Sequence, residues 1–185
     1  MNDTWDTLMS ECMSCTACEL YRTRTNVVFG TGNTNAKILF VGEAPGDNED
    51  KTGIPFVGRA GQLLDKYLYA VDIPRESVYI ANILKCRPPN NRDPLQSEED
   101  RCINFLRRQT KLINPKIIVC LGRISAKRII KPDFMITKEH GVWFEKNNIH
   151  IMAVYHPSLL LRDPHKKEAM MEDMKKIKSK LIEIS

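Results

Sequence analysis

The sequence lacks any long run of apolar residues. No stretch approaches the roughly 20 consecutive apolar residues that a helix needs to cross a bilayer. The segment Met1 to Ser10 is acidic, whereas a secretory signal starts with basic residues and continues with apolar ones. We therefore expect a cytoplasmic protein with no membrane partner.

Two glycine-rich signatures of nucleotide binding are also missing. A P-loop ending at Lys51 and Thr52 would need glycine where Pro45 and Asp50 stand. No G-x-G-x-x-G fingerprint occupies this segment either. The acidic side chains of residues 43–50 would repel a triphosphate. The sequence therefore argues against nucleotide hydrolysis.

The charge of the chain has only a modest basic excess. The 185 residues include 28 Lys and Arg against 23 Asp and Glu, and the net charge of +5 is compatible with nucleic acid without establishing it. Hydrophobic residues make up 42% of the chain and are spread along it, which is enough to bury a core. With no internal repeat or low-complexity tract, we expect one domain over residues 1–185.

Short apolar runs alternate with helical patterns along the chain. In residues 59–70, for example, Leu64, Tyr67 and Leu68 share one face of a helix. This alternation predicts an α/β fold in which helices cover both faces of a mostly parallel sheet. The expected strands are 36–42, 77–84, 116–122 and 150–155, and the expected helices are 59–70, 97–113, 124–130 and 166–184.

Polar residues stand where three of the expected strands end. The acidic segment 43–50 follows the first strand, Asn82 lies near the end of the second, and His156 follows the last. Parallel α/β sheets bind their ligands beyond the carboxyl ends of the strands. We therefore expect these three loops to converge on one crevice.

Each candidate residue in this crevice has a structural and a functional interpretation. Phe56, between glycines, can anchor its loop or offer a face on which a base stacks. Asn82 can satisfy neighbouring backbone groups or read a planar ligand, since its amide holds a donor beside an acceptor. His156 can cap a turn or donate to a ligand oxygen on which negative charge develops. The turn at 42–46 is either a tight connection or a phosphate cradle.

The six cysteines are unevenly spaced. Cys12, Cys15 and Cys18 crowd the N-terminal part, while Cys86 and Cys102 flank a proline-rich segment. Four thiolates from two distant segments suit a tetrahedral zinc ion or an iron–sulfur cluster. The wide spacing of the second pair favours the cluster. Either adjacent pair of the first three cysteines can contribute ligands.

A set of ordered motifs carries a resemblance to a known family. The motifs are Cys15-x-x-Cys18-Glu19-Leu20, Arg24, Gly42-Glu43-Ala44-Pro45-Gly46 with Glu49-Asp50, Pro55-Phe56-Val57-Gly58-Arg59-Ala60-Gly61, Asn82-x-x-Lys85-Cys86-Arg87-Pro88-Pro89 and His156-Pro157-Ser158. Together they resemble the family 4 uracil-DNA glycosylases, iron–sulfur enzymes of base-excision repair. The resemblance implies a three-layer αβα sandwich with a central four-stranded parallel sheet and uracil bound at the strand ends.

The resemblance also implies roles in the pocket. Phe56 would stack on uracil, Asn82 would read its edge, and His156 would donate toward a base oxygen. Glu43 and Glu49 would form the acidic, catalytic side of the pocket, where negative potential stabilises an oxocarbenium-like sugar. We expect the protein to flip uracil out of DNA and hydrolyse its N-glycosidic bond, leaving an abasic site.

Further pocket residues follow from the first motif. Gly42 and Ala44 would contact the substrate, and Ala44 occupies the position at which a better-known branch of the superfamily has an aspartate that positions water. A related branch traps DNA through a histidine in an insertion after the second strand. No histidine or insertion lies between Lys85 and Cys102, so we expect turnover.

The cysteines match the family pattern as a set of four. The resemblance implies a [4Fe-4S] cluster and leaves Cys12 and Cys120 outside the ligand set. Because the hydrolysis has no redox step, we expect the cluster to tie the N-terminal segment to the proline-rich loop. The implied ligands are Cys15, Cys18, Cys86 and Cys102.

Segment 156–162, with the sequence HPSLLLR, is the expected contact with DNA. Ser158, Leu159 and Arg162 would lie at the duplex, with one leucine wedged in where uracil leaves. The alternative is that the leucines begin the terminal helix and face the core. Candidates for phosphate contacts are Lys85, Arg87, Arg92, Arg162 and Lys166.

We expect a monomer that acts on uracil-containing duplex and single-stranded DNA. Two other classes of function use the same features. One is a non-catalytic iron–sulfur or zinc module that binds nucleic acid. The other is a small-molecule hydrolase that uses the same crevice.

Overall fold

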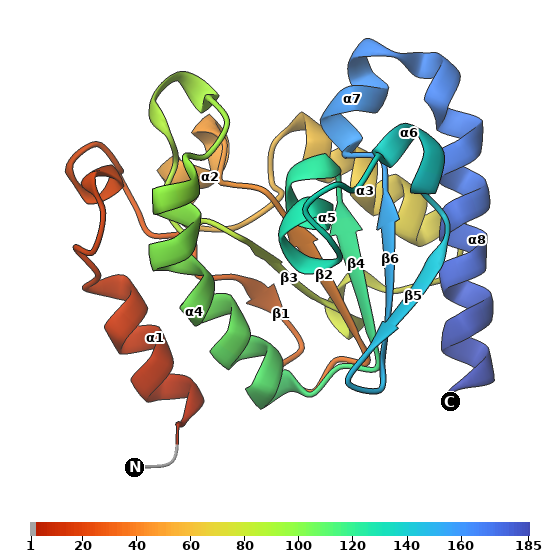
Figure 1. Ribbon diagram of the computed structural model, residues 1–185, viewed down its shortest axis with the longest axis horizontal. Coiled ribbons are helices and arrows are strands. Elements are labelled where there is room, and N and C mark those ends of the chain that lie inside the picture. The colour runs from red at the N-terminus through yellow and green to blue at the C-terminus, as the bar shows by residue number, and fades with distance from the viewer. Residues whose placement is uncertain (1–2) are drawn as a thin grey trace.

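A six-stranded sheet forms the centre of the computed structural model, which describes residues 3–185. Its strands are β1 (Thr31–Gly32), β2 (Ile38–Gly42), β3 (Tyr79–Asn82), β4 (Ile117–Leu121), β5 (Trp143–Lys146) and β6 (Ile149–Val154). In space the order is β1-β3-β2-β4-β6-β5 (Figure 1). The four central strands are parallel, and the outer strands β1 and β5 each pair antiparallel with their neighbour.

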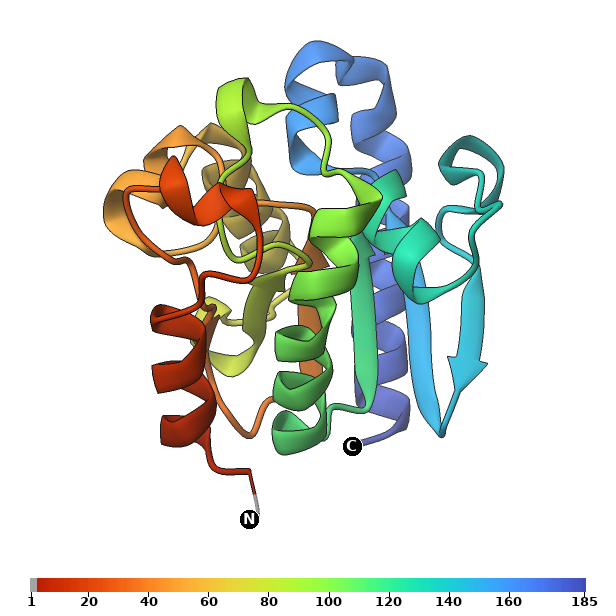
Figure 2. The ribbon, with the colours of Figure 1, turned by 60° about the vertical axis from the view of Figure 1, so that its left-hand side comes forward.

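Helices connect the strands and cover both faces of the sheet (Figure 2). The α-helices are α1 (Trp5–Met13), α2 (Asp47–Thr52), α3 (Arg59–Ala70), α4 (Gln96–Ile113), α5 (Arg123–Ile129), α6 (Ile136–Glu139), α7 (Pro157–Arg162) and α8 (Lys167–Glu183). Short 3-10 turns are η1 (Glu19–Arg22), η2 (Arg75–Ser77), η3 (Pro89–Asn91) and η4 (Pro164–Lys166).

The central strands are apolar throughout because both of their faces are buried. In β2, Ile38 and Phe40 belong to a core with α3 and α8, whereas Leu39 and Val41 belong to a second core with α4 and α5. Successive residues of a strand point to opposite faces, so this strand supplies both cores. The continuous apolar runs of the sequence reflect this double burial.

The predicted architecture is confirmed: helices lie on both sides of a sheet whose four central strands are parallel. The two short outer strands and helix α1 were not among the expected elements. Residues 157–162 form a separate helix, α7, so the alternative in which the leucines begin the terminal helix is wrong. A 3-10 turn at Pro164–Lys166 separates α7 from α8.

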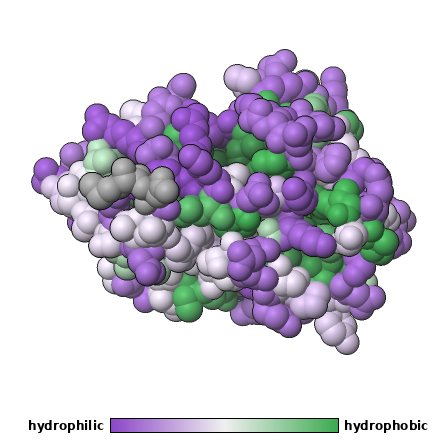
Figure 3. Space-filling model, turned by 90° about the horizontal axis from the view of Figure 1, so that it is seen from below, coloured by the Kyte–Doolittle hydropathy of each residue, from purple (hydrophilic) through white to green (hydrophobic). Residues whose placement is uncertain are grey.

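The carboxyl ends of the parallel strands lie at the end of the sheet that carries α2 and α7 (Figure 1). Viewed from the opposite end, the surface is largely hydrophilic, with apolar side chains in separate areas (Figure 3). Among residues 3–185, no helix combines the length and the hydropathy needed to cross a membrane. The loops beyond the carboxyl ends are therefore where we look for a site.

Candidate active site

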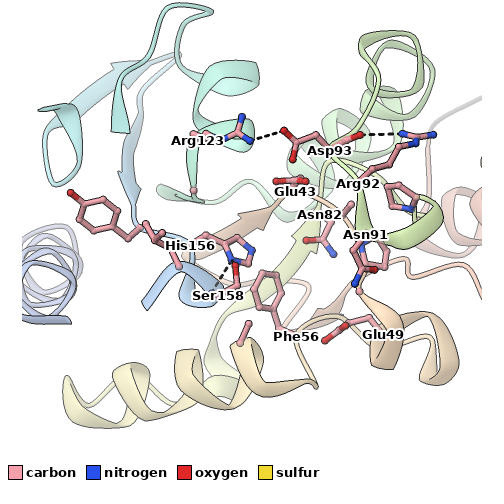
Figure 4. A pocket seen from close by; sticks show the side chains of 18 of the residues that line it. Glu43, Glu49, Phe56, Asn82, Asn91, Arg92, Asp93, Arg123, His156 and Ser158 are labelled. Atoms are coloured by element: carbon pink, nitrogen blue, oxygen red, sulfur yellow. Dashed lines mark hydrogen bonds and ion pairs between the residues drawn. The ribbon is translucent and has the colours of Figure 1, made fainter. Parts of the chain in front are cut away.

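A cavity of about 430 Å³ lies beyond the carboxyl ends of the parallel strands, within the usual range of small-ligand sites. The structure brings together the three loops expected to converge and adds a fourth, which follows β4 (Figure 4). The lining includes Glu43, Ala44, Glu49, Phe56, Asn82, Asn91, Asp93, Gly122, Arg123, Tyr155, His156, Ser158, Leu159 and Arg162.

The ring of Phe56 forms one wall of this cavity. Its centroid lies 5.8 Å from that of the His156 ring, with 35° between the two planes. Gly42 makes room for this arrangement, because a Cβ there would lie 2.7 Å from the Phe56 ring and 2.3 Å from Oδ1 of Asn82. Glycine at position 42 therefore lets the aromatic face and the amide approach one another.

Asn82 lines the cavity, and its carbonyl oxygen is buried. The residue is 1% exposed, and within the described part of the chain its Oδ1 atom has no hydrogen-bond partner. A buried acceptor without a donor costs about 1–3 kcal/mol. Figure 4 shows the side chain turned toward the same space as Phe56 and His156. The arrangement calls for a ligand that brings an N–H donor.

His156 caps the start of α7 with its ring. The backbone N–H of Ser158 donates to Nδ1 at 3.1 Å, and the Ser158 hydroxyl lies 2.7 Å from the same atom. Burial, together with the charge of Arg162, lowers the pKa of His156 to about 4. The ring is therefore neutral at pH 7, and because Nδ1 accepts, the proton is on Nε2.

Glu43 is a carboxyl group whose pKa is raised to about 7. Burial is the largest cause, and the negative charge of Asp93 adds to it, while Arg123 acts in the opposite direction. Arg123 and Asp93 form an ion pair of 2.6 Å across the cavity rim. Glu43 can therefore exchange a proton near neutral pH, as a general base must.

Glu49 uses one oxygen to hold the loop that carries Phe56. Its Oε1 accepts from the backbone N–H groups of Val57 at 3.0 Å and Gly58 at 2.8 Å. Glu49 therefore also has a structural role, which its position in the sequence did not indicate. Its carboxylate still lines the cavity.

The three leucines of α7 point in different directions. Leu159 lines the cavity, Leu160 is fully buried in the core, and Leu161 is 38% exposed. Arg162 follows at the exposed end of the helix. Leu159 and Leu161 thus remain the candidates for a wedge into DNA. Leu160 belongs to the core, as the alternative interpretation expected.

Five cysteines surround a second, small cavity between α1, η1 and the start of α4. The Arg24 guanidinium donates to Sγ of Cys86 and the Lys85 backbone N–H donates to Sγ of Cys102, both at 3.3 Å. In residues 3–185, no three metal-binding side chains group closely enough to hold one metal ion. The cysteines of this cavity are Cys12, Cys15, Cys18, Cys86 and Cys102. Cys120 is buried in β4.

One predicted phosphate contact is wrong. Lys85 is 1% exposed, and its ammonium group donates to the carbonyl of Phe29 at 3.0 Å and to Oε1 of Gln109 at 2.6 Å. These acceptors replace the water that a lysine normally keeps, so the side chain faces the interior. Arg87 and Arg92 lie near the surface in ion pairs with acidic side chains.

Several residues at the cavity were not singled out from the sequence. Asn91, Asp93 and Arg123 line its rim, and Tyr155 lies beside His156. Asn91 accepts from Nε of Arg87 at 2.7 Å. In the sequence, the polar run that follows the two prolines was the available sign of a functional role. That run looks like ordinary surface residues until the structure shows its position over the cavity.

Comparison with known proteins places the chain in a family. Residues 29–178 match the family described as the uracil DNA glycosylase superfamily. A type-4 uracil-DNA glycosylase of Archaeoglobus fulgidus is 46% identical, covering 93% of this chain and 90% of its own. One of Sulfurisphaera tokodaii is 45% identical (95% and 84%), and one of Thermotoga maritima is 46% identical (89% and 88%). The chain belongs to the uracil-DNA glycosylase superfamily and, within it, to the type-4 enzymes.

Proposed function

We propose that the protein excises uracil from DNA by hydrolysing the N-glycosidic bond, leaving an abasic site for base-excision repair. The observation that carries this proposal is Asn82, which lines the cavity and whose buried Oδ1 atom has no hydrogen-bond partner among residues 3–185. The N3–H group of uracil supplies the missing donor. The family relationship and the type-4 relatives support the same reaction.

Asn82 would distinguish uracil from cytosine. Its carbonyl accepts from N3–H while its amide nitrogen donates to O4. Cytosine offers an acceptor at N3 and a donor at C4, so both groups of Asn82 would face the wrong partner. Phe56 would hold the plane of the base by stacking, and Gly42 and Ala44 would allow its edge to approach closely.

Two residues would stabilise the opposite charges that develop during bond cleavage. Negative charge develops on uracil as the bond breaks, and Nε2–H of His156 would donate to a base oxygen. Positive charge develops on the sugar, which the Glu43 carboxylate would stabilise. With its pKa near 7, Glu43 can also take the proton of the attacking water.

Contacts with DNA would come from α7 and the rim. Leu159 or Leu161 would fill the gap left by the flipped base, and Arg162 would contact an adjacent phosphate. Ser158 would act less on DNA than on His156, whose Nδ1 it already holds. We expect a monomer that accepts single-stranded and duplex DNA.

The cysteines that line the second cavity support the proposal of a [4Fe-4S] cluster. Cysteines from two distant segments line this one cavity, and an N–H group already donates to the sulfur of Cys86 and another to that of Cys102. When bound, such a cluster supplies a cross-link that joins the N-terminal segment to the β3–α4 loop, through Cys86, and to helix α4, through Cys102. Cys15, Cys18, Cys86 and Cys102 would hold it, with Cys12 in the wall.

The deciding experiment compares DNA that contains uracil with the same DNA without it. We expect strand breaks after alkali only with uracil, in single strands, U:G duplex and U:A duplex. Binding without excision would indicate a non-catalytic module. Hydrolysis of free nucleosides in preference to DNA would indicate a small-molecule hydrolase.

A further inference from the structure

The backbone of Phe56 has a conformation that must be held in place. Its φ angle is +53°, in the left-handed region that side chains other than glycine rarely enter. Such a backbone conformation is strained, and it persists only where the surroundings of the residue fix it. The contacts that fix Phe56 therefore also fix the direction of its ring.

Arg75 supplies contacts of this kind from η2. Its guanidinium donates from Nη2 to the carbonyl of Pro55 at 3.0 Å and from Nη1 to the carbonyl of Phe56 at 3.2 Å. Asp65, on α3, accepts from the same Nη1 at 2.5 Å and orients the guanidinium. One planar group thus holds two successive carbonyls, which a lysine ammonium cannot do in the same way.

The other contacts to this loop come from two further elements. Glu49 on α2 holds the N–H groups that follow Phe56. A Cβ at Gly61 on α3 would lie 1.8 Å from the Phe56 carbonyl oxygen, so the helix backbone also abuts the loop. Arg75 differs from both, because it lies on the segment that leads into β3 and hence to Asn82.

We propose that Arg75, oriented by Asp65, is a positioning residue that sets the Phe56 ring against the Asn82 amide. This rests on the proposed function, in which uracil lies between these two groups. The guanidinium connects the loop that bears the stacking face to the segment that bears the base-reading strand. It thereby fixes the width and tilt of the slot that receives the base.

A double-mutant cycle tests this role. The variants are Arg75→Met, Phe56→Ala and the two combined, assayed by single-turnover excision from single-stranded DNA and by inhibition with free uracil. We expect Phe56→Ala to lower the rate about 5- to 150-fold, the range of a lost base–aromatic stack. We expect Arg75→Met to lower it about 10- to 100-fold through misplacement of the ring.

Additivity separates positioning from a general structural effect. If Arg75 acts through Phe56, the double variant is within about twofold of Phe56→Ala alone, because the ring it positions is already gone. Free uracil should inhibit Arg75→Met more weakly than wild type, and Arg75→Lys should recover part of the rate. Losses that multiply in the double variant would overturn the proposal while leaving the proposed function intact.

The matched control is Arg108→Met. Arg108 is similarly covered and pairs with Asp3 and Glu11, but it joins α4 to α1 and is not part of the cavity lining. We expect it to keep the wild-type rate and uracil inhibition. If Arg75→Met does not fold, Arg75→Lys and Asp65→Asn take its place in the cycle. A Phe56→Ala variant of full activity would overturn both the stacking role and the positioning role.

Discussion

The backbone N–H of Ser158 donates to Nδ1 of His156 at 3.1 Å. This one bond determines which end of the imidazole can serve the substrate, because it leaves the proton of the neutral ring on Nε2. It also links the ring to the first turn of α7. The residue expected to stabilise uracil is therefore hydrogen-bonded to the helix expected to contact DNA.

The first prediction concerns pH. The pKa of His156 is lowered to about 4, so the ring stays neutral across the working range, while Glu43 titrates near 7. If the Glu43 carboxylate is the active form, single-turnover excision rises with pH through about 7 and levels off above it. Glu43→Gln should lower the rate and abolish this rise.

The Asp93→Asn variant provides the control for the pH profile. Removing the Asp93 charge removes one cause of the raised pKa of Glu43, so the midpoint should move to lower pH. Arg123→Met should move the midpoint to higher pH because a positive charge is lost. If neither substitution shifts the midpoint of the pH profile, the titration belongs to a group other than Glu43.

The second prediction separates recognition from stability at Asn82. Asn82→Ala should lower uracil excision by orders of magnitude, while affinity for undamaged duplex hardly changes, because general affinity comes from phosphate contacts. Since Oδ1 has no hydrogen-bond partner among the described residues 3–185, the substitution should leave the free energy of unfolding within about 1 kcal/mol of wild type. Equal losses of excision and of general DNA binding would make Asn82 a structural residue.

The third prediction concerns the cysteines. Purified protein should be brown, with a broad shoulder at about 400 nm from thiolate-bound iron. Cys86→Ser or Cys102→Ser should lose iron and folded protein together, measured by iron content and circular dichroism. Cys120→Ala is the matched control, because that thiol is buried in β4, and it should retain iron.

The Cys12→Ala variant tests whether Cys12 belongs to the ligand set. It lines the same cavity as the four proposed ligands, yet we expect Cys12→Ala to keep its iron. Loss of iron in this variant would move the ligand set to include Cys12. Colourless protein with one zinc per chain would rule out the cluster altogether.

The fourth prediction concerns α7. Leu161→Ala should slow excision from U:A duplex more than from U:G duplex, and should least affect single strands, because a wedge is needed only where a base leaves a stack. Leu159→Ala, at the cavity, is the second candidate. His156→Ala should slow all three substrates alike, since its proposed role is in bond cleavage.

The neighbouring leucine is the control for stability. Leu160 is fully buried, and Leu160→Ala should lower the free energy of unfolding by about 2–5 kcal/mol in a denaturant titration. Leu161→Ala should change it little because the side chain is exposed. If both Leu159→Ala and Leu161→Ala slowed duplex and single-strand excision equally, neither would be a wedge.

Much of the fold could be predicted because its pattern is local. The run 36–42 is apolar on both faces, and β2 is buried on both. Helix α1 also had a readable pattern: Trp5, Leu8 and Cys12 share one face, behind a capping Thr4. Strand β1 had none, since its two residues become a strand only by pairing with β3.

The candidate site was predicted where strand ends carry unusual polar residues, as at Asn82 and His156. Lys85 was misjudged because its acceptors, Phe29 and Gln109, lie 56 and 24 residues away along the chain. Only the folded structure brings them together. For the same reason, no local pattern shows that Arg75 reaches the carbonyl of Phe56.

The order of the strands has a consequence for synthesis. A chain that has left the ribosome only as far as Lys146 contains Glu43, Phe56 and Asn82, but it lacks β6 and therefore His156. The nascent protein thus acquires Phe56 and Asn82, which would bind the base, before His156, one of the two residues proposed to act in bond cleavage. If His156 has the proposed role, cleavage would require that translation has delivered β6 and helix α7.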